Sequence, residues 1–246
     1  MSLNGHRSNP LLKLKQLRCC HDREMSMVDR SRAKQLAAEA IQAGKHLSWF
    51  EVLYAEVEGE SAAIPWADLT ANPNLTQWLK SHSIVPAGAS ALVVGCGLGD
   101  DAETLAESGL KVTAFDISPT CIQWCRERFP NSQVDYVTAD LLALDPTWHA
   151  SFHFVLEAYT LQVLPADLRP LAMQDIARTV AIDGTLLVIC RGREEHQDPG
   201  TMPWPLLRSE LTEFTNSGLE EIAFEDYVED EEPPVRRFRV EYRKCQ

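Results

Sequence analysis

Apolar and polar positions alternate with two different periods along the chain, and the change of period marks its regular elements. From residue 89 onward, short apolar runs are followed by segments whose apolar residues recur every three or four positions. Such segments are typical of amphipathic helices, and the short runs are typical of buried strands. The expected strands are ALVV, KVTAFDIS, QVDYVTADL, FHFVLEAYT and GTLLVIC. Strands that alternate with helical crossovers predict a mostly parallel, doubly wound sheet.

Capping residues indicate where several helices begin and end. Ser118 and Pro119 suit the N-cap and first position of the helix after the second strand. Before the sheet, an Ala-rich helix over residues 32–43 stops at Gly44. Ser48 and Glu51 then have the spacing of a capping box, which predicts a second short helix. We also expect a turn at residues 183–184, just before the fifth strand.

The C-terminal segment departs from this alternation of strands and helices. Two strand-like runs, LEEIAFEDYVED and RRFRVEYRK, are joined only by a loop that contains residues 231–234. With no helix between them, they must be antiparallel neighbours. The fold class predicted is therefore α/β, a doubly wound three-layer sandwich whose mostly parallel seven-stranded sheet ends in a C-terminal antiparallel hairpin.

Length and composition favour a single folded domain. The chain has 246 residues, of which 45% are hydrophobic, enough for one sizeable core. We expect a basic, disordered extension over residues 1–30 and one domain over 31–246, with a helical cap (31–88) and a core (89–246). There is no run of eighteen apolar residues and no signal-peptide pattern. These features predict a cytoplasmic protein with no membrane partner, either a monomer or a weak dimer.

Charge and cysteine content narrow the function classes. Residues 1–34 hold eight Lys or Arg and three acidic residues, a net charge of +5, whereas the remainder holds 15 basic and 33 acidic residues, a net charge of −18. Such an acidic body repels phosphate backbones, so we expect no nucleic-acid partner. The seven cysteines are interpreted as reduced thiols. Cys121 and Cys125 lie one helical turn apart without further ligands at metal spacing, so packing is favoured and no metal is expected.

The turn after the first strand is rich in glycine. Gly95, Gly97 and Gly99 occupy every second position, but Asp100 stands where a dinucleotide motif has its third glycine. Together with Asp101 it puts two negative charges where a pyrophosphate would lie, which disfavours a dinucleotide.

The next strand ends on an acid that completes a different pattern. The Asp116 carboxylate can accept hydrogen bonds from two ribose hydroxyls. The acids at 100 and 101 suit a ligand that is cationic at the other end. A nucleoside that carries a positive charge points to S-adenosylmethionine.

These motifs together resemble the class I S-adenosylmethionine-dependent methyltransferases over roughly residues 45–243. VVGCGLG resembles their glycine motif, FDIS the ribose-binding strand end, TADL the adenine-flanking turn, and LEAYTLQVLP the segment after the fourth strand. The resemblance implies transfer of a methyl group to a small-molecule acceptor, with S-adenosyl-L-methionine as cofactor and S-adenosyl-L-homocysteine as product. An aromatic helix, the IPW loop and the PGTMPWPLLRSEL loop are similar to those of the small-molecule branch near the thiopurine and tellurite-resistance methyltransferases.

The resemblance also implies which residues form the site. The expected cofactor-binding residues are Gly95, Cys96, Gly97, Leu98, Gly99, Asp101, Asp116, Ile117, Asp140, Leu141 and Glu157. The expected acceptor pocket contains Trp49, Tyr54, Trp66 and Trp204. An acceptor hydroxyl or amine would need to lose a proton, for which Glu157 and Tyr159 are the candidate bases.

Two positions depart from the family pattern. Val93 stands where an acid is common, so the methionine ammonium is expected to be held by backbone carbonyls near Gly95 and by Asp100 or Asp101. Glu157 begins the segment after the fourth strand where the thiopurine branch has an Asp–Arg pair, which disfavours a thiopurine-like substrate.

Alternative interpretations remain open at this point. Glu157 can be a strand-end carboxylate bonded to backbone amides, and Trp49 and Tyr54 can be core residues. At the level of the whole protein, the alternatives are a cofactor-binding module without turnover and an NAD-dependent oxidoreductase.

Overall fold

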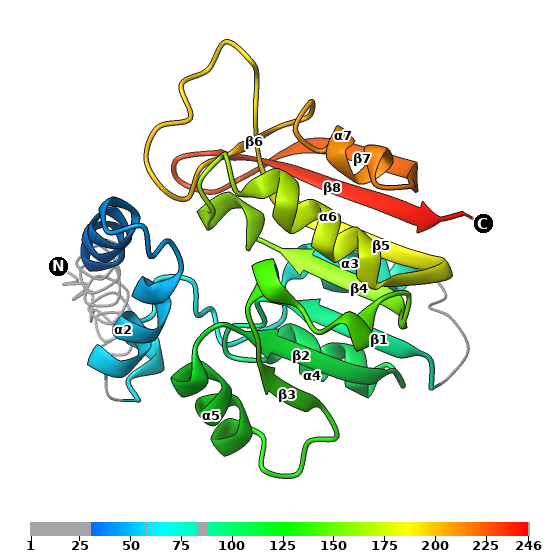
Figure 1. Ribbon diagram of the computed structural model, residues 1–246, viewed down its shortest axis with the longest axis horizontal. Coiled ribbons are helices and arrows are strands. Elements are labelled where there is room, and N and C mark those ends of the chain that lie inside the picture. The colour runs from blue at the N-terminus through cyan, green and yellow to red at the C-terminus, as the bar shows by residue number, and fades with distance from the viewer. Residues whose placement is uncertain (1–30, 58, 83–87, 246) are drawn as a thin grey trace, which may run out of the picture.

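A computed structural model describes residues 31–57, 59–82 and 88–245. Seven strands form the main sheet in the order β3-β2-β1-β4-β5-β8-β7, and the short β6 pairs with β5 (Figure 1). The strands are β1 (Ser90–Val94), β2 (Lys111–Asp116), β3 (Asp135–Thr138), β4 (Phe152–Ala158), β5 (Val180–Arg193), β6 (Leu206–Leu207), β7 (Leu219–Glu229) and β8 (Val235–Lys244). From β3 to β5 all neighbours are parallel, whereas β8 is antiparallel to both β5 and β7. The predicted fold class is confirmed.

Helices cover both faces of the sheet, which gives three layers (Figure 1). One face carries α3 (Pro73–Ser81), α4 (Asp100–Glu107) and α5 (Pro119–Arg128); the other carries α6 (Arg169–Thr179) and α7 (Thr212–Asn216). Short 3-10 helices are η1 (Ser61–Ala63), η2 (Leu141–Ala143), η3 (Pro146–Trp148) and η4 (Leu161–Val163). Alternate residues of β1 enter opposite cores, since Leu92 packs with the α6 layer and Val93 with the α4 layer. Among the described helices, none combines the length and apolarity needed to cross a membrane.

A separate helical cap precedes the sheet. A helix over residues 31–42 and α2 (Ser48–Glu56) bury their apolar faces against each other. The same cluster includes Leu98 of the glycine turn, Cys121 of α5 and Met202 of the loop after β5. The cap therefore packs over the ends of β1 and β2, where the predicted site residues begin.

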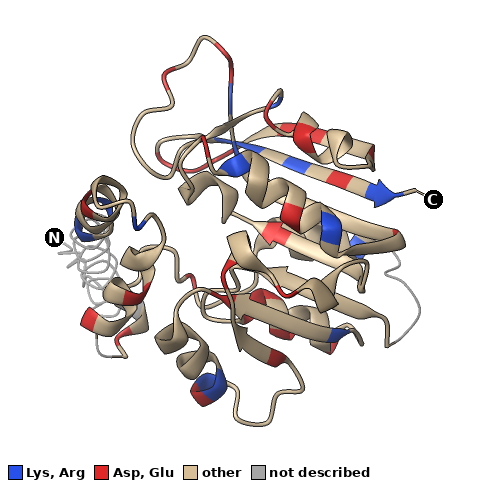
Figure 2. Cartoon of the chain, viewed as in Figure 1, with Lys and Arg blue, Asp and Glu red and all other residues tan. Residues whose placement is uncertain are grey.

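The C-terminal hairpin is tied to α3 by buried charges. Basic residues concentrate along β8 (Figure 2). Arg239 pairs with Glu225 at 2.6 Å and donates to the backbone oxygen of Asn74 at 2.9 Å, while Arg237 pairs with Glu229 at 2.9 Å. Both arginines are 7% exposed. The polar face of this strand is thus covered rather than solvated, because α3 lies over it.

The prediction of a turn at residues 183–184 is wrong. β5 begins earlier, at Val180, and continues through these residues, with Asp183 in the left-handed region at φ +62°. The register with β4 shifts between Phe152 and Phe154. Residues with turn propensity therefore form an irregularity inside a long strand, as a β-bulge allows.

The prediction of a capping box at the start of α2 is also wrong. Ser48 is the first residue of this helix and Leu47 occupies the N-cap without a side-chain bond. Glu51 instead reaches the start of α5, where it accepts from Ser118 Oγ at 2.5 Å and from Thr120 Oγ1 at 2.7 Å. The positive end of the α5 dipole and these donors together attract the carboxylate away from its own helix.

We expect Glu51→Ala to lower the free energy of unfolding by about 1–3 kcal/mol, because it leaves the amide and hydroxyl of Thr120 without their acceptor. Urea denaturation followed by circular dichroism measures this. In the same helix, Glu56→Ala removes only an exposed ion pair with Arg32, so its effect should be much smaller. Equal losses in the two variants would show that Glu51 does not join the cap to α5.

Candidate active site

The turn between β1 and α4 holds its three glycines in the left-handed region. The φ angles are +59° at Gly95, +52° at Gly97 and +90° at Gly99, which favour glycine. A Cβ atom on Gly95 would lie 2.3 Å from Thr160 Oγ1, and one on Gly99 would lie 2.5 Å from the Tyr136 hydroxyl. Packing within the protein therefore requires glycine at both of these positions, independently of any ligand.

Gly97 has a different environment. A Cβ atom there would meet nothing closer than the Tyr54 hydroxyl at 3.9 Å and two atoms of the Trp66 indole at 4.0 Å. Trp66 Nε1 donates to the Tyr54 hydroxyl at 3.0 Å, which joins the two aromatic side chains into one wall. The middle glycine of the turn thus lies against two aromatic side chains, with which a Cβ atom would make ordinary van der Waals contact.

Asp116 lies at the end of β2, beside this glycine. Its Oδ2 accepts from the Gly97 amide at 3.2 Å and its Oδ1 from the Ser118 amide at 3.0 Å. Burial raises the pKa of Asp116 to about 6, although these two amides act in the opposite direction. Each carboxylate oxygen can accept more than one hydrogen bond, so the group retains acceptor capacity for a ligand.

The two acids that follow the turn have different partners. Asp100 forms a two-point ion pair with Arg128, with both distances 3.0 Å. Asp101 accepts from the backbone amide of Asn72 at 2.7 Å, and burial raises its pKa to about 6. Because Asp100 is already neutralised, Asp101 is the better placed of the two to attract a ligand cation.

Glu157, at the end of β4, is fully buried. Its Oε1 accepts from the Thr160 amide at 2.8 Å and from the Leu161 amide at 2.9 Å. Its Oε2 has no hydrogen-bond partner among the described residues. Burial raises the pKa of Glu157 to about 7, against the effect of both amides. One oxygen thus holds the loop that packs on Gly95, and the other remains able to accept a proton.

Tyr159 follows directly and has an unusual backbone. Its φ of +66° is uncommon for a bulky residue, and such strain is concentrated at functional sites. Asn74 Nδ2 donates to its hydroxyl at 3.4 Å, and the Arg237 guanidinium lies 4.9 Å from its ring centroid. Burial raises the pKa of this phenol. Its hydroxyl therefore points toward the start of α3 and the hairpin.

The aromatic residues predicted for the acceptor pocket divide into two groups. Trp49 and Tyr54 are 2% and 1% exposed and belong to the core of the cap, while Trp66 is 37% exposed. Trp204 packs against the same cluster, and its backbone amide donates to the backbone carbonyl oxygen of Gln162 at 2.7 Å. The structure brings all four to one side of the glycine turn, but only Trp66 and Trp204 retain substantial exposure.

The remaining predicted residues lie along the same end of the sheet. Asp140 caps η2 by accepting from the Leu142 amide at 2.9 Å, and Leu141 is buried in the core. Ile117 is half-buried directly after Asp116. They are positioned beside the site, although their own contacts are structural.

Two residues contribute to the turn in a way that the sequence pattern did not indicate. Cys121 and Cys125, interpreted as packing residues, both donate to the carbonyl oxygen of Gly97, at 2.9 and 3.1 Å. Their helical spacing places both on the face of α5 that meets the turn. That spacing was the available signal, but the partner could be recognised only with the turn in place.

We expect the effect of Glu157→Gln on stability to depend on pH. The pKa of Glu157 rises from its ordinary 4.5 to about 7 on folding, so its charged form destabilises the folded protein above pH 7, on the order of 3 kcal/mol. This cost disappears as the pH falls toward 4.5. The free energy of unfolding of the variant minus that of the wild type should therefore be larger at pH 8 than at pH 5.

Urea denaturation at the two pH values measures this difference. Glu107→Gln, at an exposed position in α4, serves as the control and should show no comparable change. The same relative stability of Glu157→Gln at pH 5 and pH 8 would contradict the assignment.

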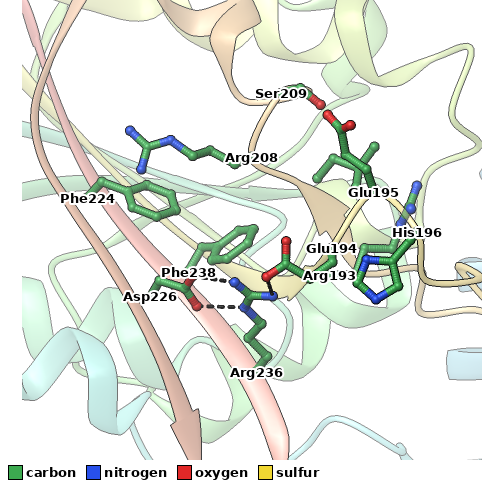
Figure 3. A pocket seen from close by; sticks show the side chains of 11 residues that line it. Arg193, Glu194, Glu195, His196, Arg208, Ser209, Phe224, Asp226, Arg236 and Phe238 are labelled. Atoms are coloured by element: carbon green, nitrogen blue, oxygen red, sulfur yellow. Dashed lines mark hydrogen bonds and ion pairs between the residues drawn. The ribbon is translucent and has the colours of Figure 1, made fainter.

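A cavity of about 560 Å³ lies elsewhere, between the end of β5 and the C-terminal hairpin (Figure 3). Arg236 crosses it and pairs with Glu194 and Asp226, both at 2.5 Å. Arg208 stacks on Phe224, with 3.8 Å to the ring centroid. None of the predicted site residues lines this cavity, so it is separate from the Gly97 turn.

Comparison with known sequences and structures identifies the domain. Residues 91–184 match the family model described as a methyltransferase domain. A relative, the cypemycin N-terminal methyltransferase of a Streptomyces species, is 25% identical over 171 residues, which cover 67% of this chain and 69% of the relative.

Solved structures share the fold. The N-methyltransferase NodS from Bradyrhizobium japonicum WM9, in complex with S-adenosyl-L-homocysteine, aligns with a TM-score of 0.61 and 21% identity over 78% of this chain and 98% of NodS. A TehB-like S-adenosylmethionine-dependent methyltransferase from Corynebacterium glutamicum aligns with a TM-score of 0.56 and 21% identity over 80% of this chain and 98% of its own. The matched domain contains the Gly97 turn, Asp116 and Glu157. The chain therefore contains a methyltransferase domain and has the fold of S-adenosylmethionine-dependent methyltransferases, as its sequence motifs predicted.

Proposed function

We propose that the chain methylates a small-molecule acceptor with S-adenosylmethionine bound between Gly97, Asp116 and the Trp66 side chain. The observation that carries this proposal is the buried Asp116 carboxylate at the end of β2, which accepts from the Gly97 amide in a glycine turn where a Cβ atom on Gly97 would meet no protein atom closer than 3.9 Å. A dinucleotide fits less well, because the acids at 100 and 101 occupy the start of α4.

Each group beside the turn has a part in holding the cofactor. Asp116 would accept hydrogen bonds from the ribose hydroxyls through its remaining lone pairs. Asp140 and Leu141 would flank the adenine. Asp101 would attract the ammonium group, and the Trp66 indole would offer an aromatic face to the cationic sulfonium.

The bound cofactor supplies a methyl group that its sulfonium already activates. The chain then has to align the acceptor with that methyl group and to exclude water, which can supply much of the acceleration. The cap and the loop that carries Trp204 pack together over the site and exclude water. For an acceptor that must lose a proton, the candidate bases are Glu157, whose Oε2 has no hydrogen-bond partner in the described part of the chain, and Tyr159.

We infer a small acceptor rather than a nucleic acid. The net charge of −18 beyond residue 34 opposes approach of a phosphate backbone. One structural neighbour is by its name an N-methyltransferase, and the cypemycin relative is by its name an N-terminal methyltransferase. Amines are therefore the first acceptor class to test.

The test is a screen with radiolabelled S-adenosylmethionine against amines, thiols, phenols and metalloid oxyanions, with calorimetric binding of S-adenosyl-L-homocysteine measured in parallel. Methyl transfer to any acceptor supports the proposal. Cofactor binding without transfer across the whole panel would favour a silent binding module. Stabilisation by NAD without binding of S-adenosyl-L-homocysteine would contradict the proposal.

A further inference from the structure

Three cysteine thiols converge on the backbone carbonyl of Gly97. Cys121 Sγ lies 2.9 Å from this oxygen, Cys125 Sγ 3.1 Å and Cys96 Sγ 3.7 Å. Cys96 belongs to the turn itself, whereas the other two project from α5. All three sulfur atoms thus lie within 3.7 Å of one oxygen atom although they come from two elements.

The three thiols are not equivalent. Hydrogen bonds from the Cys121 and Cys96 thiols lower the pKa of Cys125 to about 5, against the effect of burial. The pKa of both donors is raised, at Cys96 chiefly by its bond to Cys125. Cys125 donates to the Gly97 carbonyl only as the thiol; once it loses this proton it is the thiolate, the nucleophilic form of cysteine, so Cys125 is the reactive sulfur of the group. Cys96 is half-buried, whereas Cys121 and Cys125 are buried.

Geometry decides which pair can form a disulfide. A disulfide needs Cβ atoms about 3.5–4.5 Å apart, whereas residues four apart on one helix hold theirs about 5–6 Å apart. Cys121 and Cys125 therefore cannot be joined without distorting α5. Cys96 lies on a separate element and packs against the same cluster as Cys125, with both sulfur atoms within 3.7 Å of the Gly97 oxygen.

We propose that Cys96 and Cys125 form an oxidant-sensitive disulfide that weakens cofactor binding. This inference rests on the proposed position of the cofactor at the Gly97 turn. The oxidant is a hydroperoxide. The Cys125 thiolate attacks one peroxide oxygen, which gives a sulfenic acid and releases hydroxide. Cys96 sulfur then attacks the sulfenic sulfur; the new S–S bond replaces the S–O bond, and the thiol proton leaves with the hydroxyl group as water.

The disulfide changes the turn on which the cofactor lies. Its two sulfur atoms now lie 3.1 and 3.7 Å from the Gly97 carbonyl oxygen, so forming the bond displaces both of them beside the turn. Cys96 is drawn toward α5, since an S–S bond is about 2.05 Å long. The Gly97 amide, which is bonded to Asp116 Oδ2, shifts with it. The ribose acceptor and the turn at Gly97 are both disturbed.

The experiment treats the full-length reduced protein with hydrogen peroxide, with and without S-adenosyl-L-homocysteine. Peptide mapping by mass spectrometry should find a Cys96–Cys125 cross-link, formed more slowly when the ligand is present. Calorimetry should show affinity for S-adenosyl-L-homocysteine reduced about tenfold or more, as loss of one or two hydrogen bonds implies. Dithiothreitol should restore it.

Two variants distinguish oxidation at Cys125 from oxidation of other cysteines. Cys125→Ser should keep its affinity under peroxide, whereas the exposed Cys245→Ser should lose affinity as the wild type does. Should Cys125→Ser fail to fold, the wild-type peptide map still decides. Absence of the cross-link, or unchanged affinity in the cross-linked protein, would overturn the inference. A reduced protein that does not bind S-adenosyl-L-homocysteine would instead count against the proposed function, and the map would still test the disulfide.

Discussion

Asp116→Ala is expected to reduce affinity for S-adenosyl-L-homocysteine by about a hundredfold or more. The variant removes the charged acceptor for the ribose hydroxyls, and two hydrogen bonds to a charged group contribute about 3 kcal/mol or more. It also leaves the Gly97 amide without its acceptor, which loosens the turn itself. Calorimetry at pH 8 is the measurement, because the pKa of about 6 leaves the wild-type carboxylate charged there.

Two controls accompany this variant. Asp135→Ala removes an exposed acid from the start of β3, away from the site, and should leave affinity unchanged. Circular dichroism establishes that the Asp116 variant remains folded despite the two amides that lose their acceptor. Undiminished binding by folded Asp116→Ala would place the ribose elsewhere.

Gly97→Ala should abolish measurable cofactor binding while the fold persists. The added Cβ finds only ordinary van der Waals contacts in the protein, with 3.9 Å to the Tyr54 hydroxyl, but it occupies the space assigned to the cofactor. The φ of +52° adds backbone strain of about 1–2 kcal/mol, which lowers stability without unfolding the domain. Thermal shift with and without S-adenosyl-L-homocysteine measures both effects at once.

Gly109→Ala is the matched control for strain. This glycine ends α4 at φ +91° with nothing within 4 Å of its Cβ position, so alanine there is strained but meets no ligand. It should lower the melting temperature and still allow stabilisation by the ligand. If Gly97→Ala behaved in the same way, the turn would not be the cofactor's support.

The sheet could be predicted because each strand carries a local signal. Apolar runs, the Ser118–Pro119 helix start and the absence of a helix before β8 together determine a parallel sheet with a terminal hairpin. Predictions from local sequence failed where a side chain binds donors that are distant in the sequence. Glu51 has capping-box spacing, yet the start of α5, far along the chain, provides three donors.

The site was predictable in its position but not in its contacts. Motif order placed Gly97, Asp116 and Glu157 at adjacent strand ends, as the structure has them. It could not show that the glycines on either side of Gly97 serve internal packing, because that depends on Thr160 and Tyr136, which are distant in sequence. The pairing of Asp100 with Arg128 and the convergence of thiols on Gly97 likewise arise only when α5 packs beside the turn.

A crystal structure of the protein with S-adenosyl-L-homocysteine tests the central claim most directly. We expect both ribose hydroxyls to lie within hydrogen-bonding distance of Asp116. The ligand should contact Gly97 beneath the Trp66 indole. A ligand bound in another cavity, or Tyr54 and Trp66 filling the space against Gly97 with the ligand present, would contradict it.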